Sequence, residues 1–484
     1  MISIIDNLRI KKKCQIFTPT DIVDRMLDSI LANDDFIGKT ILENSCGNGE
    51  FLVRIVERYI ELAINKKVSP EQIRSGLEHD IVAVDVDNEL IEICKLRLNQ
   101  IAQKYGLSEI RWNVQCRDFL DIDVSNQYDY VVGNPPYIAY SDLPPNEREK
   151  LRGAFDSCKQ GKFDYCYAFI EKSIEVLATG GKLAYIIPSN VFKNVFAQEL
   201  RNMMREDIKA IIDYPEDRVF SDVLVSPAII IVEKSGAFSD LQYTKVIGNT
   251  EQTIYISKER LYGKWFFDDV NLKGKRVGAY YKVSNSIATL RNNVFILKGG
   301  YIDSDYYCLG DDRIEMALLR KATSPKNKKH SSRNQEYIIF PYYYGLNNEL
   351  LRYSEQELRA RYPLAMQYLD KHRHELEMRD ADVSAKWFEY GRSQALQNMN
   401  QKKVLISSVI SQDTQAYLIE KDEIPYAGIY VISTGELALE TLLESINSDF
   451  FKQYAACVGV SVSGASKRIT TKDIENYVLQ HGID

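Results

Sequence analysis

The chain has 484 residues, of which 45% are hydrophobic and 27% charged, as is typical of a globular protein with two or three domains. Its net charge of -7 excludes a global positive field, so a polyanion would have to bind local basic patches. The 8 cysteines are scattered without a Cys-x-x-Cys pair, which argues against a zinc ribbon and a disulfide framework. There is no signal sequence and no apolar run near the ~20 residues of a membrane span, so we expect a soluble, cytoplasmic protein.

The first half of the chain alternates helix and strand patterns. In chain order, the sequence predicts a helix at 21–30, a strand at 40–43, a strand at 81–87 with a helix after it, a strand ending near 116, a strand at 128–134, a helix at 167–181, and strands at 182–190, 208–215 and 227–234. Continuous apolar strands that alternate with helices indicate an α/β fold with a doubly wound, mostly parallel sheet. We place the end of this domain at residue 245.

The second half, 246–484, loses this alternation. It has polar turns, aromatic clusters, a basic loop at 321–333 and a charged helical stretch at 354–378. We therefore expect a second domain of the α+β class.

Polar side chains follow three of the predicted strands in the first domain. Glu43 precedes a glycine turn with Gly47 and Gly49, Asp85 ends the next strand, and Asp118 follows the third. In a doubly wound fold the carboxyl ends of the strands form the ligand crevice, glycines let a ligand approach the backbone, and an acid there can bind ribose hydroxyls. Each feature alone is also typical of an ordinary turn, but the three together predict a nucleoside site.

The fourth strand ends in Asn134-Pro135-Pro136-Tyr137. Proline fixes φ and has no N–H, so the two prolines make a rigid corner. The amide oxygen of Asn134 and the carbonyl of Pro135 are two fixed acceptors suited to one planar amino group. Tyr137 adds a face on which an aromatic ring can stack.

The stretches "FTPTDIVDRM", "ILENSCGNGEFL", "VAVDVD", "CRDF" and "VGNPPY", in this order, resemble the gamma-class N6-adenine DNA methyltransferases of restriction–modification systems. The resemblance covers about 14–235 and implies a Rossmann-like fold that uses S-adenosyl-L-methionine and needs no metal. It also implies double-stranded DNA as substrate, a location at the nucleoid of a bacterial or archaeal cell, and a separate restriction endonuclease that acts on the same site. Asn44 and Asn88 stand where the family often has proline, and neither change removes a group that the chemistry needs.

The resemblance assigns roles to the motif residues. The implied cofactor-binding residues are Phe17, Thr18, Pro19, Glu43, Cys46, Gly47 and Gly49 around the methionine part, Asp85 at the ribose, Asp118 and Phe119 at the adenine, and Asn134 beside the methyl group. The implied catalytic corner is Asn134, Pro135, Pro136 and Tyr137. The target adenine would be flipped out of the duplex, with Tyr137 stacking on it and Phe220 contacting it.

The family places a target-recognition domain after the catalytic domain, and the second half is long enough to hold one. Arg, Asn and Gln read base edges, and Lys and Arg bind phosphates. On this basis the candidate DNA contacts are Lys326, Lys328, Lys329, Arg333, Arg392, Gln394, Lys467 and Arg468. Each of them is also typical of a solvated surface loop.

Three other functions remain open from the sequence, the third being a modification subunit that needs a separate specificity subunit, against which the large C-terminal domain argues. The same Asn-Pro-Pro-Tyr corner occurs in enzymes that methylate RNA or a protein glutamine, although these usually lack a large C-terminal domain. A catalytically silent DNA-binding subunit could also retain this fold. A methyl group found on RNA or protein would indicate the first alternative, and failure to bind the cofactor would indicate the second.

Overall fold

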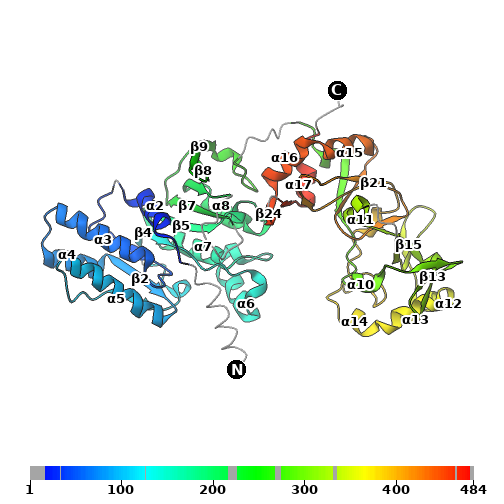
Figure 1. Ribbon diagram of the computed structural model, residues 1–484, viewed down its shortest axis with the longest axis horizontal. Helices are drawn as coiled ribbons and strands as arrows, with labels where there is room; N and C mark the ends of the chain where they lie inside the picture. Colours follow the sequence, from blue (N-terminus) through cyan, green and yellow to red (C-terminus); the bar gives the residue numbers. More distant parts are fainter. Residues whose placement is uncertain are drawn as a thin grey trace. The chain divides into compact units, whose positions relative to one another are not determined.

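A computed structural model describes residues 17–32, 34–125, 127–215, 226–267, 274–330, 335–463 and 466–479 (Figure 1). The chain divides into two compact units, Met1–Phe267 and Asp268–Asp484. The predicted boundary at residue 245 is wrong, because it would cut a strand that pairs on both sides within the sheet of the first unit. This region lost the strand–helix alternation because its last two strands form an antiparallel hairpin with many exposed polar side chains.

One sheet organises the first unit. Among the described residues it has nine strands in the order β3-β2-β1-β4-β5-β7-β6-β8-β9. Their bounds are β1 (Ile41–Glu43), β2 (Ile81–Asp85), β3 (Asn113–Cys116), β4 (Tyr128–Gly133), β5 (Leu177–Pro188), β6 (Ile208–Asp213), β7 (Pro227–Glu233), β8 (Asp240–Ile247) and β9 (Thr250–Ser257). Strands β3, β2, β1, β4 and β5 are parallel, whereas β7 lies antiparallel between β5 and β6. The predicted α/β class with a mostly parallel sheet is confirmed.

Helices cover both faces of this sheet. Their bounds are α2 (Thr20–Leu31), α3 (Glu50–Asn65), α4 (Pro70–His79), α5 (Asn88–Lys104), α6 (Pro145–Ala154), α7 (Cys166–Val176) and α8 (Gln198–Met204). Successive residues of β4 belong to the hydrophobic cores on opposite faces of the sheet. Val131 packs with α7 and α8, whereas Tyr130 and Val132 pack with α2, α3 and α5. Burial on both faces explains why these strands read as continuous apolar runs.

Helix α7 ends earlier than its sequence predicts. Its last residue is Val176, and Leu177 already pairs with Tyr128 of β4. Gly180, expected to close the helix, instead has φ +77° and lies at an irregularity in β5, where its N–H donates to the carbonyl of Lys234. The residues after Val176, which the local pattern predicts to be helical, therefore belong to β5, because they pair with β4.

The second unit combines small sheets with short helices, which confirms the predicted α+β class. Its strands are β10 (Tyr281–Asn285), β11 (Ile296–Leu297), β12 (Tyr301–Asp303), β13 (Tyr306–Leu309), β14 (Asp312–Glu315), β15 (Leu319–Thr323), β16 (Glu336–Ile339), β17 (Tyr342–Tyr344), β18 (Leu350–Arg352), β19 (Lys403–Ile406), β20 (Val409–Ile410), β21 (Tyr417–Ile419), β22 (Glu423–Pro425), β23 (Ile429–Ser433), β24 (Val460–Ser463) and β25 (Ser466–Arg468). Its helices are α9 (Val277–Tyr280), α10 (Asn292–Phe295), α11 (Pro325–His330), α12 (Glu355–Arg361), α13 (Pro363–Lys371), α14 (Arg373–Glu377), α15 (Leu439–Asn447), α16 (Asp449–Val458) and α17 (Thr471–Asn476).

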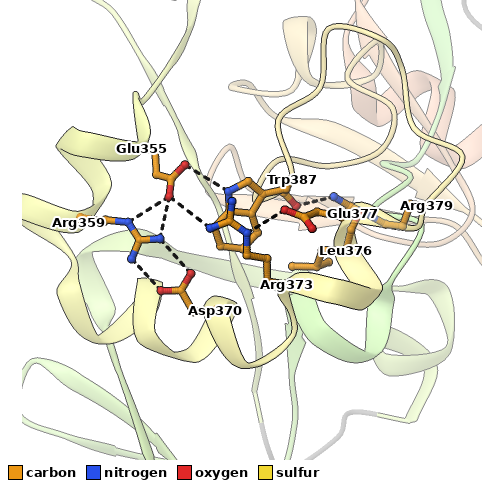
Figure 2. A network of polar contacts seen from close by, with 8 residues as sticks. All are labelled: Glu355, Arg359, Asp370, Arg373, Leu376, Glu377, Arg379 and Trp387. Atoms are coloured by element: carbon orange, nitrogen blue, oxygen red, sulfur yellow. Dashed lines mark hydrogen bonds and ion pairs between the residues drawn. The ribbon is translucent and has the colours of Figure 1, made fainter.

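The charged stretch 354–378 folds as three helices. Pro363 starts α13 because proline suits the first turn of a helix but not its interior. Arg359 of α12 binds Glu355 at 2.7 Å and Asp370 of α13 at 2.7 Å, as Figure 2 shows. Arg379 donates to the carbonyls of Leu376 and Trp387 in the same network. Arg359 therefore links α12 to α13, and Arg379 ties the chain after α14 to Trp387.

In the described part of the chain, no helix is both long and apolar enough to span a membrane.

Candidate cofactor and catalytic site

A cavity of about 500 Å³ opens at the carboxyl ends of β1, β2, β3 and β4. The parallel strands bring their C-terminal residues to one edge of the sheet, which is why residues far apart in sequence share this cavity. The predicted site residues that line it are Phe17, Thr18, Glu43, Cys46, Gly47, Asp85, Asp118, Phe119, Asn134 and Pro136.

Asp85 ties two of the strand ends together. Its Oδ2 accepts from the N–H of Gly47 at 2.8 Å, and its Oδ1 accepts from the N–H of Asp87 at 2.9 Å. The β1–α3 turn and the β2–α5 turn are thus held on one carboxylate. Each carboxylate oxygen has a second lone pair, so Asp85 retains capacity to accept from a ligand hydroxyl.

The two glycines of the turn have different surroundings. Gly47 lines the cavity and has φ +50°, and a Cβ placed there would have no atom within 4 Å. Gly49 has φ +88°, and a Cβ there would lie 2.6 Å from Sγ of Cys94. Gly49 therefore lets α3 pack against α5, and it is not part of the cavity wall.

Glu43 is the last residue of β1 and is 2% exposed. Its Oε2 has no hydrogen-bond partner among the described residues. Burial raises the pKa of Glu43 well above its ordinary value, and Cys94 and Asp85 nearby add to this rise. A buried carboxylate oxygen without a partner is unfavourable, so this end of the cavity fits a ligand that brings a cationic donor.

Aromatic rings form another part of the cavity wall. Phe119 is 1% exposed and packs on Phe169 of α7, with ring centroids 5.3 Å apart. The ring centroids of Tyr165 and Phe169 are 5.4 Å apart, and both residues line the cavity. Asp118 stands beside them, with Oδ1 accepting from the N–H of Leu120 at 2.9 Å. Tyr165 and Phe169 are not among the predicted site residues, although their i, i+4 spacing indicates one helix face.

The proline corner is fixed from two sides. The Asn134 amide nitrogen donates to Oγ1 of Thr18 at 3.2 Å, and the Ser45 hydroxyl donates to the backbone carbonyl of Asn134 at 3.1 Å. With its nitrogen held by Thr18, the Asn134 amide presents its oxygen on the opposite side. Thr18 is buried, so the segment before α2 sets the orientation of Asn134. Pro136 lines the cavity and Pro135 is buried in the corner.

Tyr137 is anchored but does not line the cavity. Its hydroxyl donates to the carbonyl of Ile186 at 2.7 Å, and burial raises its pKa well above the ordinary value. The residue as a whole is part-exposed, so the hydroxyl is held inside while the side chain still reaches the surface. Phe220, the other predicted contact to the target base, lies outside the described residues. Pro19 precedes α2 and is likewise not part of the cavity wall.

The chain from the corner into the first turn of α6 forms a part of the cavity wall that the sequence motifs did not indicate. The residues concerned are Ile138, Leu143, Pro144, Asn146 and Glu147. Ile138, Leu143 and Pro144 lie outside helices and strands, and Asn146 and Glu147 are polar residues at the start of α6, so no apolar periodicity marks them.

The predicted basic loop of the second unit is not a loop. Its first residues belong to β15, and Lys326, Lys328 and Lys329 lie on α11. Lys328 pairs with Glu423 at 2.6 Å and Lys329 lies 3.8 Å from Asp413. Arg333 is outside the described residues.

The remaining predicted DNA contacts are dispersed over the second unit. Arg392 is paired with Asp382 at 2.8 Å and with Asp380 at 3.5 Å, so its charge is compensated. Gln394 is exposed. Lys467 and Arg468 lie on β25, which pairs with β20 and β24.

The strand order and the cavity define a Rossmann-like methyltransferase fold. Residues 79–220 match the family model described as Eco57I restriction-modification methylase. The type II methyltransferase M.PaeR7I of Pseudomonas aeruginosa is 29% identical over 233 residues, which cover 46% of this chain and 40% of that protein. M.AccI of Acinetobacter calcoaceticus is 27% identical over 294 residues, which cover 57% of this chain and 48% of that protein. The chain thus spans less than half the length of these curated relatives.

Among solved structures, the type IIL restriction-modification enzyme MmeI in complex with DNA has a TM-score of 0.58 at 14% identity. The match covers 97% of this chain and 66% of that chain, and it supports the fold of the protein. The resemblance to restriction–modification methyltransferases that the motifs predict is therefore confirmed. The methyltransferase names of these relatives and the methyltransferase fold agree with the predicted cofactor, S-adenosyl-L-methionine.

Proposed function

We propose that the protein transfers a methyl group from S-adenosyl-L-methionine to N6 of an adenine in duplex DNA, as the modification enzyme of a restriction–modification system. The first unit is the catalytic domain and the second the target-recognition domain. The observation that carries the proposal is the position of Asn134, at the end of β4, in the wall of the cavity that Glu43, Asp85 and Asp118 also line. A nucleoside site and an acceptor corner for an amino group thus share one cavity.

The donor set of the cavity fits the cofactor. Glu43 brings a buried carboxylate oxygen without a partner, suited to the ammonium of the methionine part. Asp85 has acceptor capacity for the ribose, and Asp118 stands beside the aromatic wall, suited to the adenine amine. The open side of Gly47 leaves room for close approach of a ligand to the backbone. When bound, S-adenosyl-L-methionine supplies an electrophilic methyl group.

The catalytic role of the corner follows from the weakness of adenine N6 as a nucleophile, since its lone pair is delocalised into the ring. The Asn134 side-chain oxygen and the Pro135 carbonyl accept the two N6 hydrogens, which favours a pyramidal nitrogen with its lone pair directed at the methyl group. Thr18 and Ser45 hold Asn134 in place, so the acceptors need little reorganisation during the reaction. Catalysis then rests on positioning for an in-line displacement.

The target adenine has to leave the duplex to reach the corner, which costs a few kcal/mol. Stacking of a base on an aromatic side chain contributes about 1–3 kcal/mol. Tyr137 can provide this stacking because its hydroxyl is anchored on Ile186 and its ring orientation is fixed. Phe220 remains a proposed second contact to the flipped base.

The test is long-read sequencing of genomic DNA from cells that express the protein, scored for N6-methyladenine. We expect one methylated sequence motif in the wild type and in Asn88→Ala, an exposed asparagine at the start of α5 that serves as the matched control. Asn134→Ala should lose methylation by at least about a hundredfold while still binding the cofactor in calorimetry, because removing one preorganised polar group costs about 10²–10³ in rate.

Other outcomes discriminate between the alternatives. Equal loss of cofactor binding and methylation in Asn134→Ala would mean that Asn134 supports the fold, which would contradict its catalytic role. No modified adenine in a wild-type protein that binds the cofactor would favour RNA or a protein glutamine as substrate. Failure of the wild type to bind the cofactor would favour a silent DNA-binding subunit.

A further inference from the structure

A second cavity, of about 430 Å³, lies within the second unit. It is lined by Asn292, Asn293, Ile296, Lys298, Leu309 and Tyr426. None of these residues belongs to the DNA contacts that the sequence predicts. The lining thus combines two side-chain amides and one ammonium group with the apolar side chains of Ile296 and Leu309. A small number of polar groups on an apolar wall is typical of a site that binds a polar ligand in one orientation.

Glu336 organises one side of this cavity. Its Oε1 binds the ammonium of Lys298 at 3.0 Å, and its Oε2 accepts from the Tyr426 hydroxyl at 2.7 Å. The Lys298 ammonium also lies 5.3 Å from the centroid of the Tyr426 ring. The Glu336 side chain is 15% exposed, whereas the Lys298 side chain is 55% exposed. Glu336 therefore holds the Lys298 ammonium in place, and the lysine remains accessible to a ligand.

Asn292 and Asn293 provide the other polar side. Asn292 is exposed, and the Thr289 hydroxyl donates to its Oδ1 at 2.6 Å, so the bond engages the acceptor of this amide and not its N–H₂ donor. Asn293 is exposed, and its side-chain amide has no hydrogen bond to any described residue. Asn292, Asn293 and Lys298 therefore offer mainly hydrogen-bond donors.

Helix α11 borders the same cluster and carries three lysines. Its Asn327 donates to Oε2 of Glu336 at 2.7 Å and to the Tyr426 hydroxyl at 3.2 Å. Lys328 and Lys329 are paired with carboxylates, whereas Lys326 is exposed and has no ion pair within the described part of the chain. A cationic side chain that is available to phosphates therefore lies on the helix beside the donor-rich cavity.

We propose that this cavity is a base-reading site of the second unit, which receives a guanine edge of duplex DNA while α11 contacts the backbone. Guanine presents two acceptors, N7 and O6, in the major groove, and donors of the type that Asn292 and Lys298 offer match them. Lysine and amide contacts to bases specify sequence, whereas Lys326 of α11 adds affinity that does not depend on sequence. This inference rests on the proposed function and identifies the residues that choose its DNA target.

The test uses Asn292→Asp, which keeps the oxygen that Thr289 binds and replaces the amide donor by an acceptor of the same size. In long-read sequencing of DNA from expressing cells, the wild type should show a guanine at one position of its methylated motif. Asn292→Asp should lose at least about tenfold of the preference for that guanine, as expected for one lost base contact. Asn476→Asp, which makes the same charge change on α17, should leave the motif unchanged.

Several controls keep the result interpretable. Cofactor affinity and the melting temperature of Asn292→Asp should equal those of the wild type, which excludes misfolding. Lys326→Gln should weaken DNA binding equally for all sequences and lower the slope of log affinity against log salt by about 0.9. An unchanged motif and unchanged rate in Asn292→Asp would overturn the inference while the proposed function stands.

If the wild type methylates no adenine, the proposed function fails first. The cavity is then tested by selecting bound duplexes from a random-sequence library with the full chain. Enrichment of a guanine that disappears in Asn292→Asp would support the base-reading site. No enrichment, or the same enrichment in the variant, would overturn it.

Discussion

Replacing Gly49 by alanine should destabilise the first unit strongly, and the structure allows the size of the effect to be worked out. At φ +88° an L-residue pays about 1–2 kcal/mol for the left-handed backbone conformation. The new methyl group would also lie 2.6 Å from Sγ of Cys94, well inside ordinary carbon–heavy atom contact at about 3.5–4.0 Å. Overpacking of this kind costs about 1–3 kcal/mol, so we expect a loss of roughly 2–5 kcal/mol in the free energy of unfolding.

A double-mutant cycle with Cys94→Ala separates the two contributions. Without Sγ, the nearest atom to the new methyl group is the Cβ of residue 94 at 3.4 Å, so Gly49→Ala should then cost only the backbone part. Gly47→Ala is the matched control, because Gly47 has a positive φ and no atom within 4 Å of the position that its new methyl group would take. It should lose about 1–2 kcal/mol of stability and most of its cofactor affinity.

The assay is native-state hydrogen exchange in urea, read on peptides from α3 and α5, because these report the first unit separately from the second. A coupling free energy of about 1–3 kcal/mol between Gly49→Ala and Cys94→Ala is expected. Strict additivity of the two changes would refute the reasoning, because it would show that Cys94 does not limit the space at Gly49.

Two further predictions concern pH. Since burial raises the pKa of Glu43, the ionised carboxylate destabilises the fold, and this penalty grows as pH rises from the ordinary value of 4.5 through the folded-state pKa. Glu43→Gln should therefore raise the melting temperature of the cofactor-free protein, and the difference from the wild type should widen from pH 4.5 to 8. The same substitution should weaken cofactor binding. A difference in melting temperature that does not depend on pH would contradict this reasoning. Lys403, whose ammonium donates to the carbonyls of Glu420 and Glu423, has its pKa lowered by burial from 10.5 to about 8. The unfolded chain binds more protons between these values, so wild-type stability should rise relative to Lys403→Met as pH increases from about 8 to 10.5, by at most about 3 kcal/mol. Parallel melting curves for the two proteins over this range would show that Lys403 does not titrate there.

The residues at the strand ends could be predicted because a parallel sheet forces them together. Glu43, Asp85, Asp118 and Asn134 each follow a recognisable apolar strand, so their shared edge follows from the fold class. Gly49 was predicted for the same site, but Cys94, a residue on another helix, occupies the space beside it, and no local pattern indicates that contact. Local pattern places a residue on an element, whereas packing between elements decides which way it faces.

The second unit was harder to predict for the same reason. Lys328 appeared available to DNA, yet its partner Glu423 lies 95 residues further along the chain. Asn292, Asn293 and Lys298 are unremarkable in sequence and become a candidate site only through Tyr426 and Glu336, which the fold brings beside them. Ion pairs and cavities between distant segments leave no periodic signal that a single sequence can show.

The reversed strand β7 has a consequence for how the chain is made. It lies between β5 and β6, and both of these strands precede it in the sequence. Until residue 233 has left the ribosome, the growing sheet contains β3-β2-β1-β4-β5 but has no hydrogen-bonded connection to β6. At about 5–20 residues per second the 45 residues from 188 to 233 leave the edge of β5 bare for several seconds. An unpaired apolar edge can pair with other chains, so β7 is the segment that closes the edge of β5 during synthesis.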